Sequence, residues 1–199
     1  LLGASGQGPS ADLGDTIDQS LRFTGSQFLY NTNLRFNNGS AGTFSCWLKF
    51  SNRGYFNYIL GGGTSQSNGY LIHRGDGSNF GLFQTRVPSG TFTDYSSNRF
   101  RDPSAWYHIC LQNTAGGQLT LFVNNQQVGQ QTPSFGTPSA ITIGNNLTTG
   151  VDDDFSGGYM AAVYFIDGTV KSPTDFGRYN EDGVWVPQDY TGSYGTNGF

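Results

Sequence analysis

The sequence is poor in charged residues. Asp, Glu, Lys and Arg make up 12% of its 199 residues, against about 25% in an average globular domain. Glutamate occurs once, at Glu181, which argues against coiled coils and helical bundles, because these draw heavily on Glu, Lys, Ala and Leu. The ten basic residues form no run, so a nucleic-acid partner, which requires a concentrated basic face, is not expected. No apolar stretch is close to the length of a membrane-spanning helix, which needs about 20 residues.

Cysteine is also scarce, with Cys46 and Cys110 alone. Each lies inside an apolar run that is typical of a strand. We predict two buried free thiols, because unpaired cysteine packs as a small hydrophobic residue; a disulfide between the two is the alternative. A thiol nucleophile needs an electropositive, partly exposed environment, which neither run provides.

Aromatic residues and glycine are abundant. The chain holds 16 Phe, 11 Tyr, 3 Trp and 30 Gly, and this aromatic content argues against intrinsic disorder. Short apolar runs alternate with Gly, Asn, Ser and Pro, a pattern typical of an antiparallel sandwich or barrel. In residues 43–50 the alternation places Phe44, Cys46 and Leu48 on one face and Trp47 on the other. In residues 105–112 it predicts that both faces are covered.

The predicted organisation is a flexible N-terminal arm or linker over residues 1–15 and one domain over residues 16–199. The first residue is Leu, and we interpret the chain as a piece of a longer or processed polypeptide. Residues 61–63, all glycine, predict a loop, and residues 74–77 predict a hairpin turn. Asn124 and Asn125 predict a tight turn with positive φ. Residues 159–166 predict a central strand, and one short helical turn is expected near residues 172–177, capped by Ser172 with Asp175 completing a capping box.

Several segments carry a family resemblance in order. They include Thr-Phe-Ser-Cys-Trp-Leu-Lys at 43–49, residues 106–109, 121–125 and 143–144, and Phe-Ser-Gly-Gly-Tyr-Met-Ala-Ala-Val at 155–163. Together they resemble the successive strands of concanavalin A-like lectin/glucanase domains, with the laminin-G and pentraxin branches nearest. Residues 17–23, 100–108, 163–168 and 190–199 further resemble lectin-like domains of bacteriophage structural proteins. The resemblance implies an all-β jelly-roll sandwich of two antiparallel sheets, association with a virion, and glycan binding.

Catalysis is not expected. The glucanase branch places acids in a Glu-x-Asp-x-Glu pattern on one strand, and that pattern is absent here. Glycoside hydrolysis needs two carboxylates across the scissile bond, and residues 159–166 contain none. No Ser-His-Asp or Cys-His arrangement can be assembled. The alternative is a polysaccharide depolymerase built from aspartates alone.

A calcium site is the one cofactor site that the sequence indicates. Asp152, Asp153 and Asp154 form the densest charge cluster, and Asn145 and Asn146 precede it. Calcium takes six to eight oxygen ligands, and in pentraxin-like domains the corresponding loop carries metal ligands. Those domains also use Glu and Gln there, which this chain lacks. The alternative is a solvated acidic loop without metal.

Aromatic residues in polar or Gly-rich surroundings are the remaining candidates for binding. They are Tyr55, Tyr58, Tyr95 and Trp185. Sugar rings stack on aromatic faces, but interfaces between proteins also favour Tyr, Trp and Arg. The sequence leaves a glycan face and a protein interface open.

The sequence and its resemblance therefore predict a non-enzymatic virion structural protein with a lectin-like domain. It would act as a tail-fibre or capsid-decoration module, located in the virion after assembly in the host cytoplasm. Its expected partners are other virion proteins, further copies of the same chain and host surface polysaccharide. The alternatives are a depolymerase of the same fold and a pure assembly module that binds no glycan.

Overall fold

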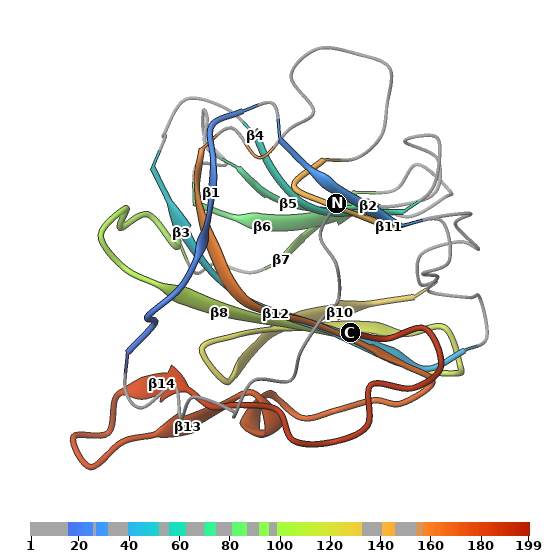
Figure 1. The fold of residues 1–199 in the computed structure, drawn as a ribbon. Helices are drawn as coiled ribbons and strands as arrows, with labels where there is room; N and C mark the ends of the chain where they lie inside the picture. Colours follow the sequence, from blue (N-terminus) through green and yellow to red (C-terminus); the bar gives the residue numbers. More distant parts are fainter. Residues whose placement is uncertain are drawn as a thin grey trace.

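The fold is a sandwich of two six-stranded antiparallel sheets (Figure 1), as predicted. The computed structural model describes residues 16–25, 27–31, 40–51, 56–62, 70–74, 81–86, 92–95, 99–132, 141–145, 155 and 157–199. The first sheet, in order, is β1 (Leu21–Phe23), β12 (Gly158–Asp167), β3 (Gly42–Phe50), β8 (Tyr107–Asn113), β9 (Leu119–Val123) and β10 (Gln126–Gln131). The second is β2 (Leu29–Asn31), β11 (Ile141–Ile143), β4 (Phe56–Gly62), β5 (Tyr70–Arg74), β6 (Phe83–Arg86) and β7 (Phe92–Tyr95).

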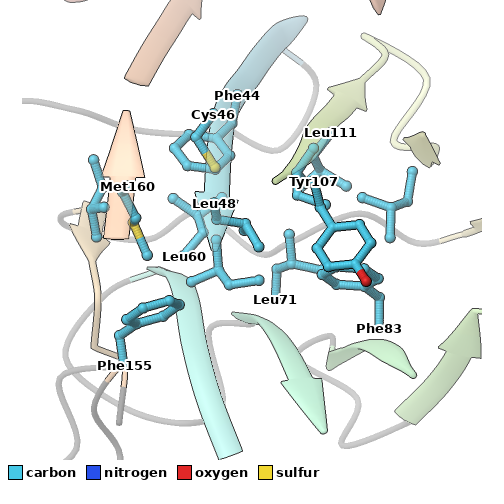
Figure 2. Close-up of a cluster of buried hydrophobic side chains, with 14 of the residues drawn as sticks. Phe44, Cys46, Leu48, Leu60, Leu71, Phe83, Tyr107, Leu111, Phe155 and Met160 are labelled. Atoms are coloured by element: carbon cyan, nitrogen blue, oxygen red, sulfur yellow. The ribbon is translucent and has the colours of Figure 1, made fainter. Parts of the chain in front are cut away.

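The core lies between the two sheets. Figure 2 shows Phe44, Cys46 and Leu48 of β3 pointing toward Leu60 and Leu71 of the second sheet. This is the face that the alternation in residues 43–50 predicts. Full burial of one such side chain stabilises the fold by about 1.5–3 kcal/mol, so the interleaved apolar faces are the main source of stability.

The outer face of the first sheet is also covered. After β12 the chain turns back and runs beneath this sheet, as the red segment of Figure 1 shows. Phe176 and Tyr190 of this returning segment pack on Cys110 and Ile166. We call residues 168–199 the C-terminal cover. It contains a short turn of 3-10 helix (Pro173–Asp175) and a hairpin of β13 (Gly177–Tyr179) and β14 (Trp185–Pro187).

Local signals in the sequence account for several turns. Asn124 and Asn125 have φ of 49° and 65° and close the β9–β10 hairpin, as predicted. Ser172 and Asp175 form the predicted capping box around the 3-10 turn. The stretch at Gly61 was expected to be a loop, and this prediction is wrong for Gly61 and Gly62. Both residues belong to β4 because β11 pairs with them, Thr142 lying opposite Gly61.

Other predictions on the second sheet were incomplete. The sequence pattern did not predict β7. The hairpin turn predicted at residues 74–77 lies outside the described residues except for Arg74, although β5 and β6 do pair on either side of it. The arm over residues 1–15 lies outside them too, so the predicted division into arm and domain stays a prediction.

The two cysteines are free and buried, as predicted. Cys46 packs in the core between the sheets, whereas Cys110 packs under the C-terminal cover. Their side chains therefore lie on opposite faces of the same sheet, which prevents a disulfide between them. Among the described residues, no helix has the length and apolar character needed to cross a membrane.

Candidate functional site

All three tryptophans of the sequence line one groove on the outer side of the first sheet. Its volume is about 460 Å³, within the about 300–1,000 Å³ typical of small-ligand sites. We call it the tryptophan groove. Its lining residues are Thr16, Ile17, Trp47, Trp106, Val184, Trp185, Val186 and Pro187. None of these side chains carries a charge.

The strands of the first sheet position the inner part of the groove. Trp47 lies in β3 directly opposite His108 of β8, and side chains opposite each other in an antiparallel pair lie on the same face. Trp106 precedes His108 by two residues, so its side chain belongs to that face as well. Trp47 is only 3% exposed, whereas Trp106 is partly exposed.

The C-terminal cover supplies the opposite wall. Trp185 lies in β14 and pairs in register with Tyr179 of β13, whose ring meets it edge to face at 4.9 Å between centroids. Gly177 makes this packing feasible, because a Cβ there would collide with the indole of Trp185. Val184, 54% exposed, forms the accessible rim of the wall.

A buried histidine joins the two walls. The indole Nε1 of Trp185 donates a hydrogen bond of 3.1 Å to Nδ1 of His108, and Ser45 Oγ lies 2.9 Å from Nε2. The Trp47 indole stacks on the His108 ring at 5.1 Å between centroids. An indole nitrogen can only donate, so Nδ1 must be the acceptor and the proton of the neutral ring sits on Nε2. His108 therefore donates to Ser45.

This protonation state excludes Ser45 and His108 as a nucleophile and its base. A general base must accept the serine proton at Nε2, and here that nitrogen already carries a proton. Burial lowers the pKa of His108 to about 3, which keeps the ring neutral in ordinary buffers. The pair is thus a structural link between β3, β8 and the C-terminal cover.

Most of the predicted calcium ligands lie outside the described residues, namely Asn146, Asp152, Asp153 and Asp154. Asn145 is described, and its carbonyl oxygen accepts a hydrogen bond of 2.6 Å from Thr142 Oγ1. In the part of the chain that the structure describes, no three His, Cys, Asp or Glu side chains come together as a metal site would require. The calcium site stays a prediction.

The four predicted aromatic residues have different places. Trp185 lines the groove. Tyr58 lies in the strand β4 and is 5% exposed. Tyr55 lies outside the described residues, and only the backbone of Tyr95, in β7, is described.

Sequence reasoning missed Trp47 and Trp106 as site residues. The alternation did place each on a definite face of its strand. The alternation could not predict that Trp47 pairs with His108, or that residues 168–199 return over that face of the sheet. The usable signal was an excess of large aromatic residues at outward-facing positions on two strands.

Comparison with known proteins places the chain in a family. Residues 23–174 match the profile of the concanavalin A-like lectin/glucanases superfamily, and the chain belongs to this superfamily. The matched range ends inside the C-terminal cover. Of the eight residues that line the groove, only Trp47 and Trp106 lie inside the matched range, and the other six lie outside it.

Solved structures share the fold. A pentraxin from Limulus polyphemus superposes with a TM-score of 0.56 at 16% identity, covering 77% of each chain. The CBM40 domain of the Ruminococcus gnavus IT-sialidase, bound to α2,6 sialyllactose, gives a TM-score of 0.56 at 16% identity, covering 77% of this chain and 92% of that one. The same domain bound to α2,3 sialyllactose gives a TM-score of 0.56 at 14% identity, and the match covers 79% of this chain and 94% of that one. No curated protein matches the chain.

Proposed function

We propose that this chain is a non-enzymatic glycan-binding module whose site is the tryptophan groove. The observation that carries the proposal is the convergence of all three tryptophans on one uncharged groove. The presence of carbohydrate-bound domains among the structural neighbours supports it.

The chemistry of the groove suits a sugar ring. A pyranose presents apolar C–H faces, which pack on indole rings, and hydroxyl groups at its edges, which remain in water at an open groove. Trp106 and Trp185 are partly exposed and come from opposite walls. A preformed apolar site with few polar groups is the usual form of a small-ligand pocket.

A binding role without catalysis is supported by the fixed roles of Ser45 and His108. The lining of the groove also lacks a carboxylate, and glycoside hydrolysis requires two. Incubating the protein with any polysaccharide it binds, followed by a reducing-end assay, tests this part. Release of reducing ends would support the depolymerase instead.

We further propose that the module belongs to a phage virion, as a fibre or decoration domain. This rests on the resemblance of residues 17–23, 100–108, 163–168 and 190–199 to virion proteins. Exposed Leu21, Phe28 and Tyr30 near the sheet edges at β1 and β2 favour contacts with further copies or other virion proteins. An in-situ structure of the particle tests both statements, and absence of the chain from purified particles would contradict them.

A glycan array tests the proposed function. The wild-type chain is compared with Val184→Asp, which places a charge on the groove rim, and with Val170→Asp, a matched control at a 37% exposed valine outside the groove. We expect binding by the wild type and the control and a loss of about tenfold or more for Val184→Asp, equivalent to about 1.4 kcal/mol. Equal binding by all three would place the site elsewhere.

Repeating the glycan array in EDTA tests whether binding depends on calcium. The groove lining contains no carboxylate, so binding there should persist in EDTA. Binding that disappears in EDTA and returns with calcium would instead assign the site to the predicted loop of Asn145, Asn146, Asp152, Asp153 and Asp154.

A further inference from the structure

A row of polar side chains crosses the first sheet beside the tryptophan groove. Arg22 of β1 lies opposite Tyr159 of β12, and Tyr159 lies opposite Lys49 of β3. Residues opposite each other in antiparallel strands project from the same face of the sheet. That face is the outer one, because the next residue of β1, Phe23, packs in the core. We call Arg22, Tyr159 and Lys49 the basic row.

The basic row adjoins the tryptophan groove. Lys49 follows Trp47 by two residues in β3, so the two side chains share a face. Tyr107 lies opposite Leu48, and the same register places the preceding residue, Trp106, next to Lys49. Both tryptophans line the groove. Neighbouring strands lie about 4.8 Å apart, so a saccharide that packs on Trp106 brings a substituent within reach of Lys49.

The two cations of the basic row are available to a ligand. Arg22 is exposed and Lys49 is partly exposed, and within the described residues neither side chain forms an ion pair. The carboxylate of Asp102 accepts hydrogen bonds from Ser104 Oγ at 2.6 Å and from Ser104 N at 2.8 Å. These bonds are the main cause of its lowered pKa, and the attraction of Lys49 is the weakest cause. The carboxylate of Asp102 therefore leaves the basic row with an excess of positive charge.

From this we infer that the basic row is an anion subsite of the tryptophan groove, and that the glycan bound there is acidic. A carboxylate or sulfate over Tyr159 would come within reach of both Arg22 and Lys49, because each lies one strand away. Hydrogen bonds between ionised groups are roughly twice as strong as neutral ones. This inference rests on the proposed function and names the ligand class of the same site.

The overall charge of the chain makes such a preference specific to this place. The net charge is −4, so the molecule as a whole repels acidic polymers. Attraction to an acidic glycan must therefore come from a local group of cations, and the basic row provides one.

Two pairs of hexasaccharides with matched backbones test the inference. Hexagalacturonate is compared with its methyl ester, which removes the carboxylate charge, and cellohexaose sulfate is compared with cellohexaose. The first pair probes a carboxylate and the second probes a sulfate. We expect calorimetric titration of the wild type to give about tenfold or greater preference for the acidic member in at least one pair, equivalent to about 1.4 kcal/mol.

The chain contains only two lysines, Lys49 and Lys171, and these provide a matched pair of variants. Lys171 lies in the C-terminal cover, with its ammonium group 5.7 Å from the centre of the Tyr190 ring. In Lys49→Gln and in Arg22→Gln, the preference for the acidic sugar should fall by about fivefold or more, because a charge-assisted hydrogen bond is lost. Lys171→Gln should keep the preference.

Nuclear magnetic resonance of the wild type gives a readout that does not depend on the folding of a variant. In a chain labelled with ¹³C at lysine, the two side chains give two sets of signals, which Lys171→Gln assigns. The preferred acidic hexasaccharide should shift the Lys49 Cε signal saturably and leave the Lys171 signal in place.

The outcomes separate the inference from the function on which it rests. Suppose that Val184→Asp abolishes array binding, but that neither acidic hexasaccharide binds better than its neutral partner, or that the Lys49 signal does not move. Either result would overturn the inference and leave the glycan-binding function standing. A preference that both Lys49→Gln and Arg22→Gln retain would also overturn it. The absence of binding to any glycan on the array would overturn both.

Discussion

At the scale of single residues, the clearest case is His108. Its hydrogen bonds with Trp185 and Ser45 determine which ring nitrogen carries the proton, and that nitrogen is Nε2. The serine–histidine pair therefore has a structural role and not a catalytic one. Two such residues close in space are insufficient evidence of a nucleophile. The direction of the hydrogen bond decides between the two roles.

His108 should make the stability of the fold depend on pH. Its pKa is about 3 when folded, against 6.5 for an unperturbed histidine. Below pH 6.5 the unfolded chain therefore binds a proton that the folded chain does not bind, and the free energy of unfolding falls with pH at up to about 1.4 kcal/mol per unit. Urea unfolding at pH 7 and pH 5.5 should show a loss of about 1 kcal/mol.

Two variants isolate this contribution. In His108→Gln, the free energy of unfolding should differ little between pH 7 and pH 5.5, because glutamine does not titrate. His73→Gln, at the other histidine of the chain, should retain it. An unchanged pH dependence in His108→Gln would contradict the assignment of a neutral buried ring.

At the scale of elements, the sequence predicts strands better than it predicts their partners. The face alternation of residues 43–50 and the asparagine turn at residues 124 and 125 follow from local chemistry. The membership of Gly61 and Gly62 in β4 does not, because glycine alone indicates a loop and only the pairing with β11 makes them a strand. The groove needs the contact of Trp185 in β14 with His108 in β8, which no local pattern contains.

Gly158 marks the point where β12 begins, and its replacement should be costly. It has φ of +145°, and a Cβ there would collide with the Lys49 carbonyl oxygen of β3. Gly158→Ala should destabilise the fold by about 3 kcal/mol or more, measured by thermal or urea unfolding.

Gly116→Ala is the matched control for this substitution. A Cβ at Gly116 would meet Thr114 Oγ1 at an ordinary 3.8 Å, so a change within about 0.5 kcal/mol is expected. Similar losses for the two variants would show that the backbone at Gly158 is not constrained in this way.

At the scale of the whole molecule, the central strands β3 and β8 of the first sheet form a buried layer. The core lies on one side of this sheet and the cover lies on the other (Figure 1). Composition and alternation predicted the sandwich, and the capping box predicted the short turn at residues 173–175. They could not predict that residues 176–199 would close a groove against β3 and β8, because that depends on contacts between distant segments.

The two cysteines report on this arrangement. Burial raises the pKa of both thiols above the ordinary value, and a thiol reagent reacts with the exposed thiolate. We expect no fast labelling of the folded chain and two labelled thiols in denaturant. If Cys110 were labelled well before Cys46, the cover would open independently of the sandwich.

The central claim is that the tryptophan groove binds a glycan. Because all three tryptophans line the groove, the intrinsic fluorescence of the protein reports directly on its occupancy. Titration with the strongest glycan from the array should shift the tryptophan emission saturably, and the shift should be lost in Val184→Asp and kept in Val170→Asp. Saturable binding by calorimetry without any change in tryptophan emission would contradict the account.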